Sequence, residues 1–366
     1  MKKLNLCAYA FLTIIFVGMG GSLLLKDREV SFDERRKLTQ LPKYKIEDVL
    51  SGKYVEKLDE YLLDQFIGRD MFRTIKTSFD QKILKKIDSN GYVERDGSIF
   101  QIETETKIEN VKNAANSFDL IGEKYFPEAN IYYSIIPDKN YFLGDIPSID
   151  VDEIEKIMVN TMTDYTYIDI KDSLKLEDYY RTDLHWKQED IIEISDKILA
   201  NMSGEEYNRE SKFKEKMASK LFLGGYGASS AYHVKRDDLI YLEDEIIKNA
   251  TVYDYEKLKE SGIYFLDEKD GIDPYNIFLG GAKALLSIKN PQNKSGKRLL
   301  LFRDSFGSSI APLLLEEYSE IVMIDLRYVN LEYGLSLLEN DEFEDVLFLY
   351  NALLLHNSHS MKLPTK

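Results

Sequence analysis

The chain has few of the residues that build redox and metal centres. Its 366 residues include one cysteine, four histidines and one tryptophan. A single cysteine excludes a disulfide framework and a cysteine-based zinc cage. Positive charge is also scarce: 48 Lys and Arg stand against 64 Asp and Glu, for a net charge of −16. Because so acidic a surface repels phosphate backbones, we expect no nucleic-acid partner.

The longest uncharged run lies near the start of the chain. Residues 4–25 contain no charged side chain and follow Lys2 and Lys3. A helix of this length is about 33 Å long, enough to cross a hydrocarbon core. Basic residues on its leading side favour a cytoplasmic N-terminus. We therefore expect a single-pass membrane anchor with an extracytoplasmic C-terminal domain, and secretion after signal cleavage is the alternative. The single cysteine, Cys7, lies in this segment.

Hydrophobic patterning divides the remainder into two parts. Residues 26–90 repeat apolar side chains at helical spacing between charged ones, which predicts a helical neck. Residues 91–366 alternate apolar strands with helices, which predicts one α/β domain with a parallel sheet covered by helices on both faces. The predicted strands are 131–136, 165–170, 298–302, 321–325 and 346–350, and the predicted helices are 188–202, 307–317 and 331–338.

One strand-to-helix junction carries the best chemical signal. Residues 298–317 read RLLLFRDSFGSSIAPLLLEE, so Ser305 stands at a turn between a buried strand and a helix. A serine in this context is exposed beside helix N–H groups that can hold an oxyanion. The small residues Gly307, Ser308 and Ser309 leave room for a substrate carbonyl. The alternative is that Ser305 only caps the helix.

A nucleophilic serine needs a base, and His185 is the best placed histidine. It follows Asp183 by two residues, so both side chains face one side of an extended stretch. The aspartate can then orient the imidazole, and Trp186 can pack against the pair. A structural salt bridge or a capping network is the alternative; a metal site with Glu189 lacks a supporting motif. The other histidines are expected at the surface: His233, His356 and His359.

Two glycine-rich segments border this candidate site. Residues 223–227 and 279–281 lack phosphate-loop spacing, so we expect tight turns or backbone N–H donors there. The candidates for oxyanion or substrate binding are Gly280, Gly281, Arg303 and Trp186.

Several motifs resemble those of a known family. Residues 182–186 (TDLHW) and 303–306 (RDSF) are the most specific, and residues 34–36, 64–70, 90–100 and 136–139 add to them. The chain resembles the DHHW family of exported bacterial proteins, which is related to the SGNH-like alginate O-acetylation proteins. This resemblance implies an SGNH-hydrolase-like fold without cofactor or metal. It makes Ser305 the nucleophile, His185 the general base and Asp183 its orienting acid.

Two positions depart from the family pattern. Leu184 occupies the first histidine of D-H-H-W, a position that is not assigned to the base. Ala282 stands where relatives often carry asparagine, so a side-chain oxyanion donor is missing. The resemblance then implies that the backbone N–H groups of Ser305 and of a nearby glycine stabilise the oxyanion.

The resemblance also implies a function. We expect an O-acetyltransferase that modifies a cell-surface or exopolysaccharide through an acyl-enzyme. A multi-pass membrane acyltransferase would supply the acetyl group, and residues 4–25 would contact the membrane. Two alternatives are a carbohydrate acetyl-esterase with the same triad and a non-catalytic protein that binds polysaccharide or an assembly complex.

Overall fold

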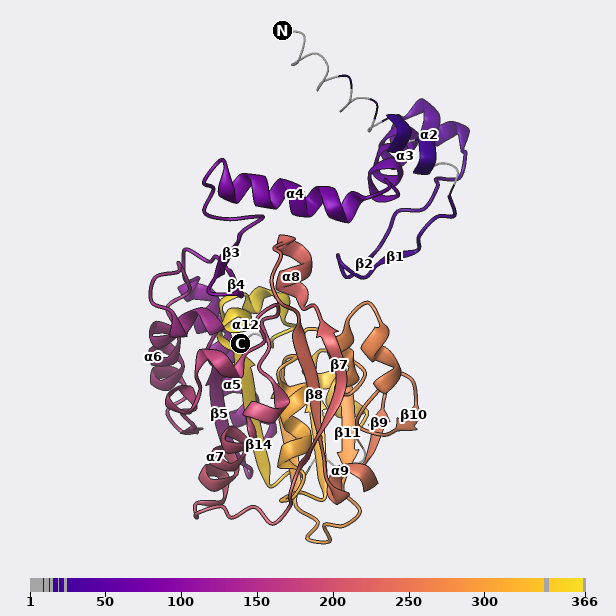
Figure 1. Ribbon diagram of the computed structural model, residues 1–366. Coiled ribbons are helices and arrows are strands. Elements are labelled where there is room, and N and C mark those ends of the chain that lie inside the picture. The colour runs from indigo at the N-terminus through magenta and orange to yellow at the C-terminus, as the bar shows by residue number, and fades with distance from the viewer. Residues whose placement is uncertain are drawn as a thin grey trace.

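An eight-stranded sheet forms the centre of the protein in the computed structural model (Figure 1). The structure describes residues 9, 13, 16–18, 20–22, 25–338 and 342–364. The strand order is β10-β9-β11-β13-β12-β14-β5-β6. The bounds are β5 (Asn130–Ile136), β6 (Thr166–Tyr167), β9 (Thr251–Asp254), β10 (Lys259–Ser261), β11 (Leu285–Lys289), β12 (Arg298–Arg303), β13 (Glu320–Ile324) and β14 (Asp345–Asn351).

Five of these strands are parallel, and three extend the sheet in the antiparallel sense. Strands β13, β12, β14, β5 and β6 run in one direction. Strand β11 pairs antiparallel with both β13 and β9, and β9 pairs antiparallel with β10. The expectation of a purely parallel sheet is therefore wrong for one end of the sheet. The short turn between β9 and β10 permits only antiparallel pairing, because a parallel neighbour needs a long crossover.

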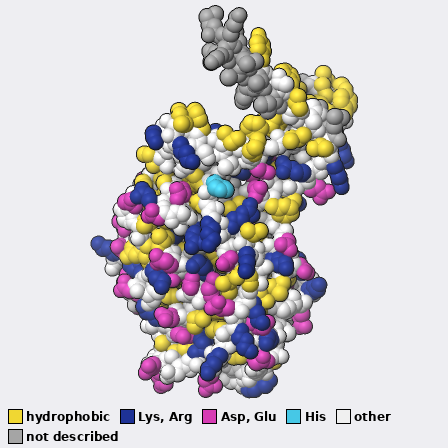
Figure 2. Space-filling view, in the orientation of Figure 1, with side chains coloured by type: hydrophobic (Ala, Val, Ile, Leu, Met, Phe, Trp, Pro, Cys, Tyr) yellow, Lys and Arg dark blue, Asp and Glu magenta, His cyan; other side chains and the backbone are white. Residues whose placement is uncertain are grey.

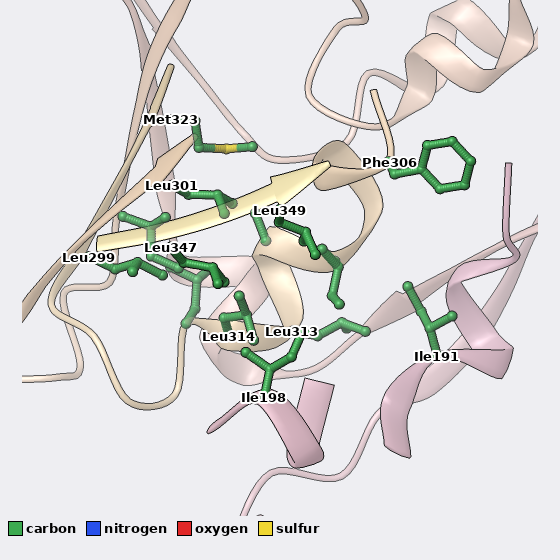
Figure 3. Packing of buried hydrophobic residues seen from close by; sticks show 14 of the residues in the cluster. Ile191, Ile198, Leu299, Leu301, Phe306, Leu313, Leu314, Met323, Leu347 and Leu349 are labelled. Carbon is green, nitrogen blue, oxygen red and sulfur yellow. The ribbon is translucent and has the colours of Figure 1, made fainter. Parts of the chain in front are cut away.

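Helices cover both faces of the sheet, as the sequence predicts. Leu299, Leu301 and Leu347 belong to a buried cluster with η7 (Ala311–Leu314) and α7 (Ile192–Ser203), shown in Figure 3. The alternate residues of the same strands, such as Phe302 and Phe348, pack on the other face. The helices on that face are α5 (Ile108–Tyr125), α6 (Val151–Thr161), α11 (Leu331–Ser336) and α12 (Ala352–His356). Because both faces are buried, these strands are continuously apolar.

The predicted elements differ from the observed ones mainly at their ends. The predicted strand 165–170 is only β6, and the predicted helix 188–202 is a short 3₁₀ turn, η4 (Gln188–Asp190), followed by α7. The predicted helix 307–317 is α10 (Gly307–Ile310) continued by η7, which carries Pro312 in its first turn. The region 203–275, which lies between the predicted elements, contains β9, β10 and a separate hairpin of β7 (Lys214–Phe222) and β8 (Asp237–Glu243).

The neck consists of a two-stranded hairpin and three helices. Its elements are β1 (Val30–Ser31), β2 (Arg36–Lys37), α2 (Ile46–Leu50), α3 (Lys53–Asp64) and α4 (Arg69–Lys82). The hairpin of β3 (Tyr92–Arg95) and β4 (Ser98–Gln101) then begins the body. Helix α4 lies across the end of the body that carries α8 (Gly225–Ser230) (Figure 1). There Arg73 donates to the carbonyl oxygen of Ala228 at 2.8 Å.

Hydrophobic side chains gather on the visible surface of the neck, whereas charged side chains are interspersed over the body (Figure 2). Most of the predicted membrane segment, residues 4–25, lies outside the described residues. No helix in the described part of the chain is both long and apolar enough to cross a membrane.

Candidate active site

Ser305 lies between the carboxyl end of β12 and the start of α10, as the sequence predicts. Its side chain is half-buried, whereas its neighbours Asp304 and Phe306 are buried. The turn is tight: a Cβ at Gly307 would lie 2.6 Å from Cβ of Arg303, so only glycine fits there. Asp304 stabilises the turn because its carboxylate accepts hydrogen bonds from the backbone N–H groups of Phe306 and Asn351, at 2.9 and 2.7 Å.

Ser305, His185 and Asp183 form one chain of hydrogen bonds. The distance from Oγ of Ser305 to Nε2 of His185 is 2.7 Å, and the distance from Nδ1 of His185 to Oδ1 of Asp183 is 2.5 Å. The three residues come from two segments about 120 positions apart. The structure therefore brings together the three residues that sequence reasoning paired, in the geometry of a nucleophile, a base and an orienting acid.

Asp183 is buried and held as a carboxylate by several donors. Its Oδ2 accepts from the backbone N–H of Gly225 at 2.6 Å and from Nη1 of Arg35 at 3.0 Å. Burial by itself raises the pKa of Asp183, but His185, Arg35 and the Gly225 N–H outweigh it and hold the pKa well below its usual range. Asp183 is therefore ionised at neutral pH and can stabilise a protonated His185.

The loop that carries Asp183 is fixed on two sides. Nζ of Lys139 is fully buried and donates to the carbonyl oxygens of Tyr180, Arg181 and Asp183, at 2.8, 3.2 and 3.0 Å. Thr182 donates through its backbone N–H and its hydroxyl to the carboxylate of Asp237, at 2.9 and 2.7 Å. Burial lowers the pKa of Lys139 to about 8, partly opposed by neighbouring carboxylates. The loop is thus anchored before any substrate arrives.

The glycine-rich segment 223–227 completes this support. Gly224 donates its backbone N–H to Oγ1 of Thr182 at 2.8 Å, and Gly227 donates to the carbonyl oxygen of the same residue at 2.8 Å. Together with the bond from Gly225 to Asp183, these contacts make the segment a set of N–H donors at the site. This is one of the two roles that its sequence predicts.

Tyr275 contacts the base directly and was not found from the sequence. Its ring stacks on the imidazole of His185, with ring centroids 3.9 Å apart and planes 9° apart. Its hydroxyl donates to Oγ of Ser309 at 3.0 Å, and Nε1 of Trp186 donates to the same oxygen at 2.8 Å. One serine hydroxyl therefore fixes both the ring that stacks on His185 and the indole of Trp186, which contacts Phe306.

Four sequence-based assignments need correction. Arg303 and Trp186 were candidates for substrate contact, but both side chains are buried, and Arg303 lies 3.6 Å from the buried Asp325. Ser308 and Ser309 are buried as well, so they leave no room for a substrate carbonyl. These four side chains lie on the side of the Ser305 turn that packs against the core, so they support the turn and do not face a substrate.

The second glycine pair lies in a turn before β11. Both residues have positive φ, 72° for Gly280 and 82° for Gly281, which favours glycine. The backbone N–H of Gly281 donates to the carbonyl oxygen of Phe278 at 3.3 Å, so it is engaged in the turn. Gly280 stays a candidate for the oxyanion site, and the structure records no hydrogen bond between either described glycine and Ser305.

The remaining histidines lie away from this chain of hydrogen bonds. His233 and His359 are exposed, as expected, but the expectation for His356 is wrong because it is buried. Its Nδ1 accepts from the backbone N–H of Lys107 at 3.1 Å, and burial lowers its pKa. Among the described residues, no group of three His, Cys, Asp or Glu side chains is arranged to hold a metal ion.

Comparison with known proteins agrees with the fold and the motifs. The chain is similar to a crystal structure of a DHHW family protein from Eubacterium siraeum, with 22% identity, a TM-score of 0.63 and coverage of 76% of this chain and 98% of that one. It is also similar to Bacillus cereus PatB1, once in a structure with a sulfonyl adduct, at 16% identity and a TM-score of 0.56, covering 72% and 97% of the two chains. A second PatB1 structure gives 17% identity and the same TM-score of 0.56.

These likenesses show a shared mixed α/β fold with a mostly parallel central sheet. No curated protein matches the chain. The family model described as DHHW protein matches residues 139–324, about half of the chain, and includes both Asp183 and His185 as well as Ser305. The chain belongs to the DHHW protein family.

Proposed function

We propose that this protein is an SGNH-like serine O-acetyltransferase that acetylates hydroxyl groups of an extracytoplasmic polysaccharide. The observation that carries the proposal is the chain of hydrogen bonds from Ser305 through His185 to the ionised Asp183. Family membership and the likeness to PatB1 support the choice of fold class. The half-buried Ser305 is accessible to an acyl donor, whereas the acid and its supports are buried.

The geometry supports a two-step reaction through an acyl-enzyme. In the first step, Oγ of Ser305 attacks the acetyl carbonyl of the donor ester, and its proton passes to Nε2 of His185. The ester bond to the donor alcohol breaks, and the leaving oxygen takes the proton from His185. In the second step, a sugar hydroxyl gives its proton to His185 and attacks the acetyl carbonyl. Oγ of Ser305 leaves and regains the proton.

Asp183 and the backbone have separate tasks in this reaction. The carboxylate of Asp183 holds the imidazole with Nε2 toward Ser305 and stabilises its protonated form. In our proposal, the backbone N–H groups of Ser305 and Gly280 stabilise the oxyanion of the tetrahedral intermediate. A multi-pass membrane acyltransferase is the donor that we propose, with residues 4–25 as the membrane anchor. No cofactor or metal takes part.

Transfer and hydrolysis differ only in the acceptor. We would incubate the protein with a chromogenic acetyl ester and an oligosaccharide, and identify the products by mass spectrometry. An acetylated sugar, formed by the wild type and lost in Ser305→Ala, supports the transferase. Free acetate without acetylated sugar would contradict transfer and assign the same triad to an esterase. If neither product forms, the protein is not an acetyl-transfer enzyme on these substrates, and the proposal fails.

A sulfonyl fluoride provides an independent test of the nucleophile. Such reagents sulfonylate activated hydroxyl groups, and PatB1 has been observed with a sulfonyl adduct. We expect a sulfonyl group on the peptide that contains Ser305, formed much faster in the wild type than in His185→Ala. Equal labelling rates would contradict the role of His185 as the base.

A further inference from the structure

One side chain of the neck reaches the candidate active site. Arg35 lies in the turn between β1 and β2, and its φ of 51° is in the left-handed region. Its guanidinium is 11% exposed and donates from Nη1 to Oδ2 of Asp183 at 3.0 Å. Nη2 forms an ion pair with Asp273. Arg35 thus donates a hydrogen bond from the neck to the Ser305–His185–Asp183 chain, although 148 positions separate it from Asp183.

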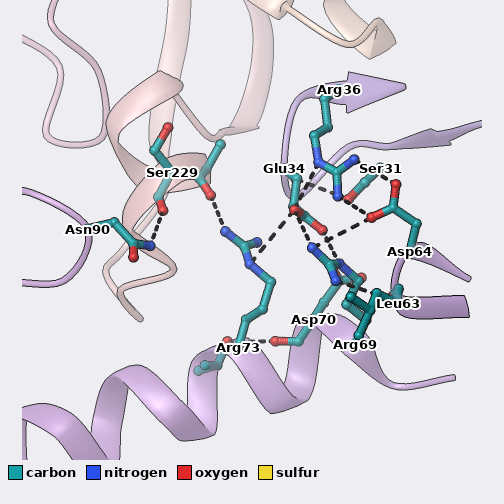
Figure 4. A network of polar contacts seen from close by, with 12 residues as sticks. Ser31, Glu34, Arg36, Leu63, Asp64, Arg69, Asp70, Arg73, Asn90 and Ser229 are labelled. Carbon is teal, nitrogen blue, oxygen red and sulfur yellow. Dashed lines mark hydrogen bonds and ion pairs between the residues drawn. The ribbon is translucent and has the colours of Figure 1, made fainter. Parts of the chain in front are cut away.

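A network of charged side chains holds the turn that carries Arg35 (Figure 4). Glu34 accepts from Nε of Arg69 at 2.7 Å and from Nε of Arg36 at 3.0 Å. Arg36 also binds both carboxylate oxygens of Asp64, at 2.6 and 2.9 Å. Burial raises the pKa of Glu34, but these arginines outweigh it and lower the pKa, so the glutamate stays charged. The turn is thereby fixed to α3 and α4.

The two oxygens of the Asp183 carboxylate have different partners. Oδ1 faces the imidazole of His185, while Oδ2 accepts from Arg35 and from the Gly225 backbone N–H. A carboxylate bound on one oxygen by two donors has little freedom to rotate. The guanidinium contact therefore fixes the direction in which Oδ1 points, and through it the orientation of His185.

We propose that Arg35 is a positioning residue for the Asp183–His185 pair, so that the neck is part of the catalytic unit. This proposal rests on the proposed triad but not on the identity of the acceptor. The neck network keeps Arg35 in place from one side, and the contact of Arg73 with Ala228 ties α4 to the body from the other. A displaced neck would leave Asp183 with one donor fewer on Oδ2.

Chemical rescue distinguishes positioning from a merely structural role. In the full chain, Arg35→Ala removes the guanidinium and leaves space beside Asp183 for a free guanidinium ion. We expect kcat to fall at least about tenfold with KM nearly unchanged, and to recover when millimolar guanidinium is added. Arg28→Ala is the matched control, because Arg28 pairs with Asp70 in the same neck but its side chain is 46% exposed. We expect wild-type kcat and no guanidinium effect in this variant.

Two results would overturn the proposal. The first is wild-type kcat in Arg35→Ala. The second is a loss of activity that guanidinium does not restore, together with a lower unfolding temperature, because that pattern indicates loss of the fold. The rate of Ser305 sulfonylation is measured in parallel, since it reports His185 positioning without any acetyl substrate. A protein that is inactive on acetyl esters but whose sulfonylation depends on Arg35 would contradict the proposed function and still support the positioning role.

The outer face of α4 carries a second proposal, which rests on the proposed membrane anchor and not on the triad. Five apolar side chains recur at every fourth position and are exposed by 44% to 64%: Ile67, Met71, Ile75, Phe79 and Ile83. We call this set the α4 stripe. The opposite face of the helix binds the body through Arg73 and Thr77. The stripe therefore points away from the body, and an apolar row of this kind is typical of an interaction surface.

The position of the stripe indicates what covers it. The backbone N–H of Ile67, where the stripe begins, donates to Oγ of Ser22 at 3.0 Å. Ser22 belongs to the uncharged stretch 4–25, so the stripe is continuous with the segment expected to enter a membrane. The exposed Lys82 and Lys85 flank Ile83 at its other end, where they can contact anionic headgroups. We propose that the α4 stripe lies on the surface of the lipid bilayer that holds residues 4–25.

Lipid quenching tests this contact on the full chain. We would place Ile75→Trp, in the α4 stripe, in nanodiscs of phosphatidylcholine and phosphatidylglycerol with brominated acyl chains. Leu258→Trp is the control, since Leu258 is 73% exposed in the turn after β9, and the native Trp186 is buried and gives the baseline. We expect strong quenching for Ile75→Trp alone. Equal quenching in both variants would overturn the proposal. The proposal would also be overturned if the tryptophan at position 75 were not quenched by the lipid and became shielded from solvent only when two chains associate. That result would indicate a second copy of the chain as the partner of the α4 stripe.

Discussion

A methyl group added at Gly224 would collide with the acid of the triad. An alanine Cβ at this position would lie 2.2 Å from Cβ of Asp183, 2.4 Å from its Oδ2 and 2.5 Å from the carbonyl oxygen of Thr182. Real Cβ atoms essentially never approach non-bonded heavy atoms closer than 3.0 Å, so the backbone near position 224 or the Asp183 loop must move. A displacement of Asp183 lengthens its hydrogen bond of 2.5 Å to His185.

The size of the effect follows from these contacts. A displacement of about 1 Å in catalytic geometry costs about 10²-fold in rate, and complete loss of the orienting carboxylate costs about 10⁴-fold. We therefore expect kcat of Gly224→Ala to fall between these limits. Overpacking costs about 1–3 kcal/mol of stability, so the fold is retained in a protein of ordinary stability.

The assay is hydrolysis of a chromogenic acetyl ester, with unfolding in urea measured on the same samples. Gly262→Ala is the matched control, because no atom lies within 4 Å of its ideal Cβ and its φ is not positive. We expect Gly262→Ala to keep both activity and stability. A folded Gly224→Ala protein with wild-type kcat would refute the reasoning, since it would show that the position of Asp183 does not control the rate.

Changes at three further residues test the surroundings of the site. Tyr275→Phe keeps the ring that stacks on His185 and loses one hydrogen bond, so we expect a stability loss of about 1 kcal/mol with little change in kcat. Tyr275→Ala removes the ring as well and should lower kcat about tenfold. Urea unfolding measures the stability of both variants, and ester hydrolysis measures their kcat. Lys139→Met removes the Nζ donor from three backbone carbonyls, of which that of Arg181 still accepts from the backbone N–H of Ile99 at 2.8 Å. We expect a loss of about 2–4 kcal/mol in urea unfolding, and unchanged stability would show that these hydrogen bonds contribute nothing. Burial raises the pKa of Asp138 from 3.8 to about 6, so the folded protein binds more protons than the unfolded chain between these values. The free energy of unfolding should then fall as pH rises through this window, by about 3 kcal/mol at most, and Asp138→Asn should remove that slope in thermal melts.

Local sequence patterns predicted the elements that position the nucleophile. Strands β5, β12 and β14 are buried on both faces, so each is a continuous apolar run that is visible in the sequence. Asp183 and His185 are two residues apart, so their contact is local in sequence, although residues 181–185 form bends and not the extended stretch that the sequence predicts. The turn at Ser305 is equally local, because the strand before it and the small residues after it are adjacent in sequence.

Contacts between residues far apart in the chain could not be predicted from the sequence. Arg35 meets Asp183 across 148 positions, and no periodicity in the neck indicates that its side chain points into the body. Tyr275 is one of 25 tyrosines, and only the folded chain shows that its ring stacks on His185. Arg303 has a charge that suggested substrate contact, but packing against Asp325 places its guanidinium in the core. In each case tertiary packing decides which way a polar or aromatic side chain points.

The central claim is that Ser305, activated by His185 and Asp183, carries the acetyl group. The most direct measurement is mass spectrometry of the protein quenched in acid during turnover of an acetyl ester. We expect one acetyl group on the peptide that contains Ser305, absent in Ser305→Ala and strongly reduced in His185→Ala. An acetyl group on another residue, or turnover by a folded Ser305→Ala protein, would contradict it.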